Sequence, residues 1–501
     1  MLPSNLRHWK SSFQFVIACF VSFLLLQPLF AQSTDQQQPS LSSPDKPQIT
    51  AKPDKADESA DGNKEQKISP AEAKELFQSV DQILKFASKD SGLPIKHSVR
   101  PKLTSRDEVV TYLEKNMRED KSAQRVYRSE LVLKKFGLLP RDFHLEAAVV
   151  AMLREQVAGY YDPKSKTMNL LDWVPIDQQK PVLAHELTHA LQDQSFNLEK
   201  WMKKGDVDLD KKKHITPDDI EADEADEARE AVVEGQAEAI MLNYILAPVG
   251  RTVLNSPETL ATLDADMLSG TPDSAEFKNA PIFLRESLTF PYRYGLKFVA
   301  ALLQDGGKEK AFASTFKNEP RSTRQIMEPK TYLSGERIEP MALPDLNKIF
   351  KDYERFDAGA IGEFDLAMLI EQYAGVETSN RMYPAWRGGY YYSARPKGNP
   401  AAPLGLLYVS RWSDAGKASQ FAAIYAKSLA KRYKNVQEVS PEKTDGELEK
   451  AESLSGTHTW QTEEGPVVIE VRADTVLVSE SLEQKITEEL EKDVFSVSQG
   501  K

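Results

Sequence analysis

The chain alternates between stretches with the 3.6-residue apolar spacing of helices and shorter stretches with the two-residue spacing of strands. We expect the first helix to begin at Ser69 and Pro70, because serine caps a helix and proline fits its first position. Helical spacing returns over residues 105–136 and again from Asp142. Further helices are expected over residues 179–194, 216–246 and 290–303.

Two short strands are expected immediately before the helix over residues 179–194. Residues 157–161 and 167–171 flank the turn-forming sequence Asp162-Pro163-Lys164-Ser165, which predicts a β-hairpin. The edge of such a hairpin could pair with an extended peptide through main-chain hydrogen bonds. It could equally serve only to support the core, and the pattern leaves both interpretations open.

The C-terminal third mixes both spacings, which predicts an α+β fold class with a separate C-terminal domain. Pro340 and Pro344 indicate a boundary, and a helical stretch is expected from there to about Tyr373. The elements expected beyond it are strands at 389–394 and 404–409, a helix at 415–433, strands at 457–461, 466–471 and 475–479, and a helix at 482–494. We therefore expect an α+β domain of unknown role over residues 341–501.

Composition places the chain among soluble globular proteins with a sizeable core. Its 501 residues exceed one ordinary domain, 40% are hydrophobic and 28% are charged. The formal net charge is −12, and no sustained basic stripe occurs. These features argue against a nucleic-acid partner.

The N-terminal segment predicts export from the cytoplasm. Arg7 and Lys10 precede an apolar run over residues 13–30, so residues 1–31 read as a signal peptide that ends at Ala31. The alternative is an uncleaved anchor formed by residues 13–30, which would be the chain's only contact with a membrane. Either interpretation gives an extracytoplasmic location, periplasmic or secreted.

The composition of residues 32–67 and the single cysteine are both compatible with a location outside the cytoplasm. Residues 32–67 are rich in Gln, Ser, Pro, Asp and Lys, which predicts a disordered linker. Cys19 is the only cysteine, so a chain cleaved after Ala31 has neither a disulfide nor a thiol. A lipoprotein interpretation of Cys19 fits poorly, because most of the apolar run follows it.

The strongest chemical signal is the sequence His185-Glu186-Leu187-Thr188-His189. Histidines four residues apart lie on one face of a helix, and Glu186 can reach a water bound to the same ion. This is the H-E-x-x-H arrangement of zinc hydrolases, in which the glutamate is the general base and not a ligand. A surface helix with two solvated histidines is the alternative, so a third ligand decides between the two.

The helix over residues 216–246 offers candidates for the third ligand. Glu234 stands out because Gly235 and Ala237 allow close packing, and a buried glutamate is costly unless it is paired or binds a metal. Glu238, one turn later, could accept a hydrogen bond from the outer nitrogen of a ligating histidine. Asp193 could orient His189, or could be an exposed aspartate at a helix end. The other glutamates of this helix are expected to form a solvated acidic face: Glu224, Glu227 and Glu230.

An H-E-x-x-H motif followed by a glutamate on a downstream helix resembles the gluzincins, the thermolysin-like clan of zinc metallopeptidases. Glu234 and Glu238 match that clan's spacing between the ligand glutamate and an acidic residue four positions later. The form Glu234-Gly235-Gln236-Ala237 resembles a group of uncharacterised bacterial secreted proteins, and the likeness covers about residues 155–332. The resemblance implies a mainly helical zincin-like core over residues 68–340 and a polypeptide substrate.

The same resemblance implies the roles of individual residues. His185, His189 and Glu234 would hold one Zn²⁺, and Glu186 would be the general base. Thermolysin-like enzymes stabilise the oxyanion with histidine and tyrosine side chains. The candidates for that role are Tyr292, Tyr294 and Tyr332, with core packing as the alternative for each; related sequences often carry histidine where this chain has Glu328.

Three functions follow from these observations. The leading one is a secreted or periplasmic zinc-dependent endopeptidase. The second is an inactive zinc-binding scaffold with a metalloprotease-like fold, although a structural site has no need of Glu186. The third is a metal-free extracytoplasmic interaction protein.

Overall fold

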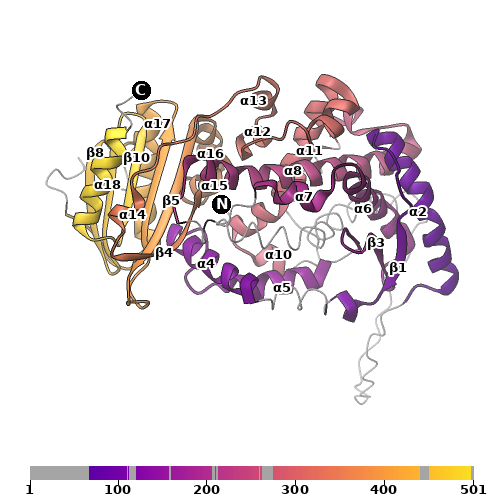
Figure 1. Cartoon of the computed structure of the whole chain (residues 1–501), viewed down its shortest axis with the longest axis horizontal. Coiled ribbons are helices and arrows are strands. Elements are labelled where there is room, and N and C mark those ends of the chain that lie inside the picture. The colour runs from indigo at the N-terminus through magenta and orange to yellow at the C-terminus, as the bar shows by residue number, and fades with distance from the viewer. Residues whose placement is uncertain are drawn as a thin grey trace, which may run out of the picture.

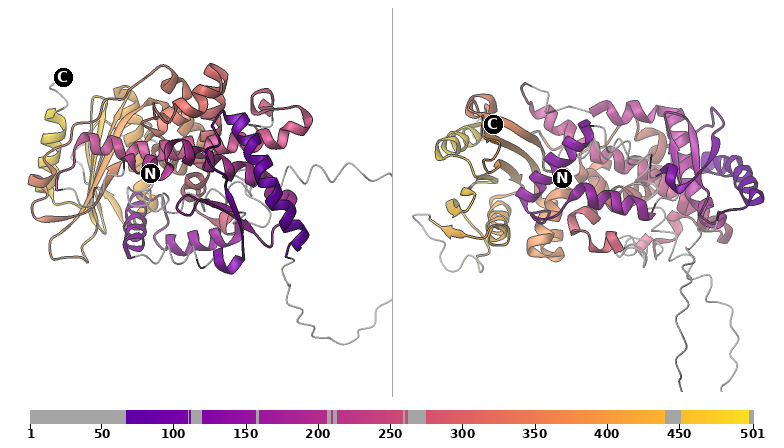
Figure 2. Two further views of the ribbon diagram at one scale, coloured as in Figure 1. Left: turned by 45° about the vertical axis from the view of Figure 1, so that its right-hand side comes forward. Right: turned by 90° about the horizontal axis from the view of Figure 1, so that it is seen from below.

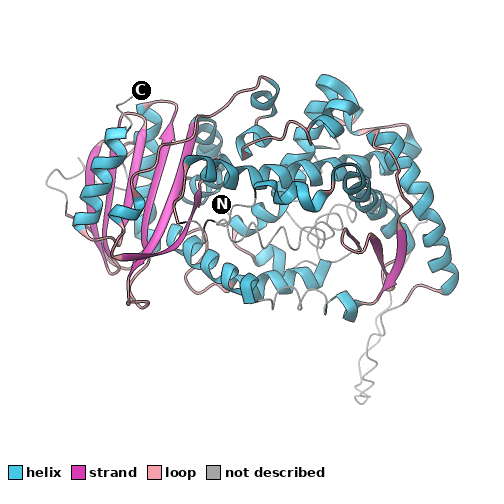
Figure 3. Cartoon of the chain, viewed as in Figure 1, coloured by secondary structure: helices cyan, strands magenta, loops and turns pink. Residues whose placement is uncertain are grey.

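The computed structural model describes residues 67–109, 111, 120–156, 159–205, 209, 213–258, 260–261, 275–439 and 451–497. The expected signal peptide and the expected linker up to residue 66 lie outside this range. Within it, no helix is both long enough and apolar enough to cross a membrane. The described residues form an α+β structure, as expected, with a helical part and a seven-stranded sheet side by side (Figure 1, Figure 3).

Three long helices form the centre of the helical part: α6 (Ile176–Phe196), α8 (Pro217–Leu246) and α11 (Ile282–Lys308). Helix α8 packs against both of the others. It begins with a capping box, in which Thr216 and Asp219 bond to each other's backbone N–H groups. The predicted helix over residues 216–246 is therefore confirmed. Helix α11 begins eight residues before the expected Phe290, because Pro291 is accommodated inside it.

Helix α2 (Pro70–Ser91) packs across α6 and α8. Ser69 and Glu72 form its capping box and Gly92 ends it in a left-handed conformation, so the predicted start is confirmed. The other described α-helices of the helical part are α4 (Asp120–Phe136), α5 (Leu145–Gln156), α7 (Leu198–Met202), α10 (Ala275–Asn279), α12 (Thr323–Met327) and α13 (Pro329–Leu333).

A three-stranded sheet closes the end of the helical part that is remote from the large sheet (Figure 2). The predicted hairpin is confirmed for β2 (Tyr160–Asp162) and β3 (Thr167–Leu171), and residues 157–158 of the expected first strand lie outside the described residues. Strand β1 (Arg100–Thr104) pairs with β3 in parallel and was not expected, because its alternation is weak and it contains Pro101. The order β1-β3-β2 leaves β2 at one edge.

The large sheet is antiparallel, in the order β4-β5-β6-β10-β9-β8-β7. Most of its strands lie where they were expected. Strand β4 and the short β7 were missed, and the helix expected before Tyr373 is confined to α15 (Glu363–Ala374). The strands are β4 (Tyr353–Ala360), β5 (Trp386–Pro396), β6 (Gly405–Trp412), β7 (Val436–Glu438), β8 (Gly456–Thr462), β9 (Gly465–Arg472) and β10 (Thr475–Glu480).

Helices cover both faces of this sheet. Helices α15 and α17 (Ala415–Arg432) pack on the face toward the helical part, together with α16 (Val376–Met382). Helices α14 (Leu346–Ile349) and α18 (Gln484–Val497) cover the outer face over a second, smaller core. The main core is continuous from α2 to β10, so residues on either side of position 340 share one apolar interior.

The acidic face expected along α8 is buried instead of solvated. Glu224, Glu227 and Glu230 are between 2% and 6% exposed, so that prediction is wrong. Glu224 accepts hydrogen bonds from the backbone N–H and the hydroxyl of Thr323, at 2.9 and 2.7 Å. The buried Glu224 carboxylate thus satisfies a backbone group of a neighbouring segment, a use that the sequence of the helix does not reveal.

Candidate metal centre

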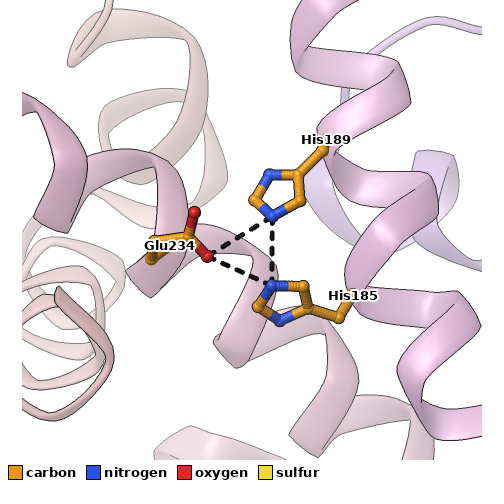
Figure 4. Close-up of side chains that lie close together, drawn as sticks. All are labelled: His185, His189 and Glu234. Atoms are coloured by element: carbon orange, nitrogen blue, oxygen red, sulfur yellow. Dashed lines mark hydrogen bonds and ion pairs between the residues drawn. The ribbon is translucent and has the colours of Figure 1, made fainter. Parts of the chain in front are cut away.

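His185 and His189 project from α6 toward Glu234 on α8 (Figure 4). Their Nε2 atoms lie 3.0 Å apart. Glu234 Oε2 lies 3.2 Å from Nε2 of His185 and 3.4 Å from Nε2 of His189. The three candidate ligands, which are far apart in the sequence, therefore meet in one buried triangle of donor atoms.

The dimensions of this triangle fit a tetrahedral ion. With bonds of about 2.0–2.1 Å, two ligands of a tetrahedral centre lie about 3.3 Å apart. The three observed separations run from 3.0 to 3.4 Å. Two imidazoles and one carboxylate suit Zn²⁺ and several other divalent first-row ions. A buried group that could hold one metal ion is thus present, although its donors alone do not select zinc.

The position of Glu234 depends on the glycine that follows it. Gly235 lies against the backbone of Gly295 on α11, and a methyl group at Gly235 would lie 2.2 Å from the Gly295 carbonyl carbon. The backbones of α8 and α11 therefore come into direct contact at these two glycines. Glu234, on the neighbouring face, is turned toward α6.

His185 has a carboxylate behind it. Its Nδ1 lies 3.2 Å from Glu238 Oε2, and both side chains are fully buried. Nδ1 can donate its proton to this carboxylate, which leaves Nε2, the nitrogen that faces Glu234, as the atom available to a metal ion. Such an outer contact fixes the ring and makes it a stronger ligand.

Asp193 does not support His189, contrary to one of our two expectations for it. Gln192 Oε1 lies 2.9 Å from Nδ1 of His189. Asp193 instead accepts a hydrogen bond from the Tyr161 hydroxyl at 3.1 Å and one from the backbone of Leu198 at 3.2 Å. Its carboxylate is directed toward the hairpin and α7, so it fixes neighbouring elements and not the ring.

Glu186 lies beside the triangle and under the edge strand β2. Its Oε2 accepts a hydrogen bond of 2.9 Å from the backbone N–H of Tyr161. Burial raises the pKa of Glu186, against the lowering effect of nearby His189 and His185. The predicted hairpin thus contacts Glu186, which lies next to the triangle but is not one of its three donors.

The charges of the cluster favour a cation. Burial lowers the pKa of His185, but hydrogen bonds to Glu234 and Glu238 outweigh it, and the pKa rises to about 10. Burial raises the pKa of Glu234, but the electrostatic effect of His189 and hydrogen bonds with both histidines outweigh it and lower the pKa to about 2. Without a metal, a proton therefore stays in this cluster at neutral pH.

Of the three tyrosines considered for oxyanion stabilisation, Tyr292 is the one that packs beside a candidate ligand. Its ring is nearly parallel to the His185 ring, with centroids 6.3 Å apart. Tyr294 is about 200° further around α11 and packs against Phe290. The Tyr332 hydroxyl donates to the carbonyl of Asn318 at 2.6 Å, away from the centre. Glu328 pairs with Arg324 at 3.0 Å.

The centre is enclosed by protein. His185, Glu186 and His189 are 0% exposed, and Glu234 is 2% exposed. The three donor atoms could hold an ion, but a polypeptide can reach them only after part of the surrounding chain moves. This enclosure is the strongest structural constraint on what the centre does.

Two residues that contact the centre were missed from the sequence. Gln192 was passed over although it lies three residues after His189, a spacing that brings side chains together on a helix. Tyr161 acts through its backbone N–H, which no side-chain motif can reveal.

Comparison with known proteins gives no relative. No family model matches the chain, and neither a curated protein nor a solved structure matches it.

Proposed function

We propose that this chain is an extracytoplasmic zinc-dependent endopeptidase, with one Zn²⁺ held by His185, His189 and Glu234. The observation that carries the proposal is the buried triangle of three donor atoms at tetrahedral spacing, with Glu186 beside it. The resemblance of H-E-x-x-H and Glu234 to gluzincins supports zinc over other ions and supports a zincin-like core.

Zinc in such a site would act as a Lewis acid that polarises the peptide carbonyl and lowers the pKa of water to ~7. Glu186 takes the proton of the attacking water and delivers it to the leaving amine. The hydrogen bond from Tyr161 N–H holds the Glu186 carboxylate in one orientation. Burial keeps the pKa of Glu186 above its ordinary value, which makes the carboxylate a better proton acceptor.

A polypeptide substrate is supported by the edge strand β2 as well as by the resemblance. Strand β2 lies at the edge of its sheet and contacts Glu186, so a peptide added beside it would pass the candidate catalytic groups. Tyr292 packs against His185 and is the tyrosine that we propose for oxyanion stabilisation. The signal peptide, or an anchor over residues 13–30, would place the enzyme outside the cytoplasm.

The enclosure of the centre favours a second candidate, a zinc-binding scaffold without turnover. All four side chains of the centre are at most 2% exposed, as in a structural metal site. The two candidates differ in Glu186. A structural site loses nothing when this residue becomes neutral, whereas an enzyme loses its general base.

Peptide cleavage by the wild type and by Glu186→Gln separates the two candidates. Both proteins are loaded with zinc and incubated with casein and with a mixture of unstructured peptides. Cleavage by the wild type that falls by about 10²-fold or more in the variant supports the enzyme. Bound zinc without cleavage by either protein supports the scaffold.

A further inference from the structure

A continuous chain of hydrogen bonds leads away from His189 through two buried glutamines. We propose that Gln192 and Gln236 are positioning residues that hold the His189 ring with a proton on Nδ1, so that Nε2 is the nitrogen left for a metal ion. The proposal rests on the metal site described above, because a free Nε2 lone pair is what a metal ion requires.

The orientation of Gln236 is fixed by backbone carbonyls. Its Nε2 lies 2.8 Å from the carbonyl oxygen of Ala311 and 3.2 Å from that of Phe312. It also lies 2.9 Å from the hydroxyl oxygen of Thr315. Carbonyl oxygens only accept hydrogen bonds, so the amino group of Gln236 must face them. Its Oε1 is consequently the end that faces Gln192.

The orientation of Gln192 follows from that of Gln236. Gln192 Nε2 lies 2.9 Å from Gln236 Oε1 and 3.1 Å from the carbonyl oxygen of Val233. Both of these atoms are acceptors, so Nε2 must be the donor. This leaves Gln192 Oε1 directed at Nδ1 of His189, 2.9 Å away. The nitrogen facing an acceptor must donate, and Nδ1 therefore carries a proton.

The opposite ring tautomer would be costly. It would set the Nδ1 lone pair against Gln192 Oε1, with no water to separate them, because His189, Gln192 and Gln236 are all 0% exposed. A buried acceptor left without a donor costs about 1–3 kcal/mol. The network of amides thus keeps a proton on Nδ1 and leaves Nε2, which faces Glu234, as the nitrogen that can bind a metal ion.

The network also joins the helices that carry the ligands. Gln192 lies on α6 and bonds to the carbonyl of Val233, the residue before Glu234 on α8. Gln236 continues the chain to Ala311 and Phe312 in the π-helix η4 (Glu309–Ser314), which follows α11. One set of hydrogen bonds therefore fixes both the protonation of one ligand and the position of another.

The metal affinity of matched glutamine variants tests the proposal. Gln192→Met and Gln236→Met keep the side-chain length but remove the amide. Gln179→Met is the control, because Gln179 is also buried on α6 and bonds to Leu171 and Val174, remote from the centre. Zinc affinity is measured by competition with a chromophoric chelator, beside the unfolding free energy of each metal-free protein.

We expect Gln192→Met to weaken zinc binding by about 10–100-fold and Gln236→Met to weaken it less, because Gln236 acts through Gln192. Gln179→Met is expected to lose stability but to keep zinc affinity within about twofold. In Gln192→Glu a carboxylate oxygen can still accept from Nδ1, so affinity is expected to recover although stability does not. Equal affinity in the wild type and Gln192→Met would overturn the proposal, as would an equal loss in Gln179→Met.

A readout without metal separates this proposal from the proposed function. Nitrogen-15 spectra of metal-free, histidine-labelled protein show which ring nitrogen carries the proton, and His189→Ala identifies the His189 signals. We expect a protonated Nδ1 at His189 in the wild type and a loss of that preference in Gln192→Met. An unprotonated Nδ1 in the wild type refutes the amide network even if zinc binds. A protonated Nδ1 in a protein that binds no metal upholds the network and refutes the metal site.

Discussion

Gly235 on α8 and Gly295 on α11 bring two helix backbones into direct contact. A methyl group at Gly295 would lie 2.3 Å from the carbonyl oxygen of Ala231, and one at Gly235 would lie 2.3 Å from the carbonyl oxygen of Gly295. In both cases the methyl group would meet backbone atoms and not a flexible side chain, so the two helices would have to move apart. Because Glu234 precedes Gly235, this contact also sets the distance between the carboxylate and the two histidines.

Gly235→Ala is therefore expected to damage both stability and metal binding. Overpacking of this kind costs about 1–3 kcal/mol, and the displaced helix moves Glu234. Chemical unfolding and zinc titration measure the two effects. Gly416→Ala, near the start of α17, is the control and is expected to change stability by about 0.5 kcal/mol or less. Unchanged zinc affinity in Gly235→Ala would show that the helix contact does not position the ligand.

Removal of the metal is expected to make stability depend on pH in the alkaline range. The pKa of His185 is about 10 in the folded, metal-free protein, against an ordinary value of 6.5 for a histidine in an unfolded chain. A raised pKa contributes stability that is complete below pH 6.5 and is lost as the pH rises through 10. The slope of this one group is at most about 1.4 kcal/mol per pH unit.

Urea unfolding in the presence of a chelator, at a series of pH values across this window, measures the effect. The His185→Gln variant lacks the group and should lose this part of the slope. A wild-type stability that stays flat or rises with pH would contradict the expectation, and so would an unchanged slope in the variant.

Glu480 is expected to hold the helical part and the large sheet together. It is fully buried and accepts hydrogen bonds from the Tyr425 hydroxyl at 2.7 Å and from Arg432 at 2.5 Å. Arg432 in turn donates to the carbonyl of Lys135 on α4 at 2.6 Å. Glu480→Gln leaves the arginine buried without its counter-charge, and we expect a loss of about 3–5 kcal/mol.

Glu464→Gln is the matched control for that variant. Glu464 also pairs with Lys135, but its side chain is 22% exposed, so a loss of about 1 kcal/mol or less is expected. Thermal unfolding monitored by circular dichroism compares the two variants. An equal loss in both would mean that burial of the Glu480 carboxylate carries no special weight at this interface.

Glu238 is expected to contribute to zinc affinity and not only to the stability of the fold. Glu238→Leu removes the acceptor behind His185 Nδ1 and should weaken zinc binding by about 10–100-fold. Glu238→Gln keeps an oxygen that can accept the same hydrogen bond and should lose less. If both variants bind zinc as tightly as the wild type, Glu238 does not orient the ligand.

Local signals in the sequence were enough to place helices α2, α6 and α8 and the three candidate ligands. Ser69 and Thr216 are helix caps whose chemistry is confined to one turn, and both helices begin where these caps predict. The spacing of His185 and His189 guarantees that they share a helix face. Gly235 indicated a close packing contact, although nothing in the sequence named Gly295 as its partner.

Features that depend on another element could not be predicted. Asp193 and Gln192 both lie about one turn after His189, and the choice between them depends on Tyr161, which draws the Asp193 carboxylate away. Glu224 looks like a solvated residue until Thr323 is seen to donate two hydrogen bonds to it. In each case the deciding partner is distant in the sequence.

The metal content of the purified protein tests the central claim most directly. Wild type, Glu234→Ala and Glu186→Gln are refolded with zinc, dialysed and measured by atomic emission. We expect one equivalent of zinc in the wild type and in Glu186→Gln, and none above background in Glu234→Ala. A wild type without stoichiometric metal would contradict the claim, and a Glu234→Ala variant that retains a full equivalent would refute the third ligand.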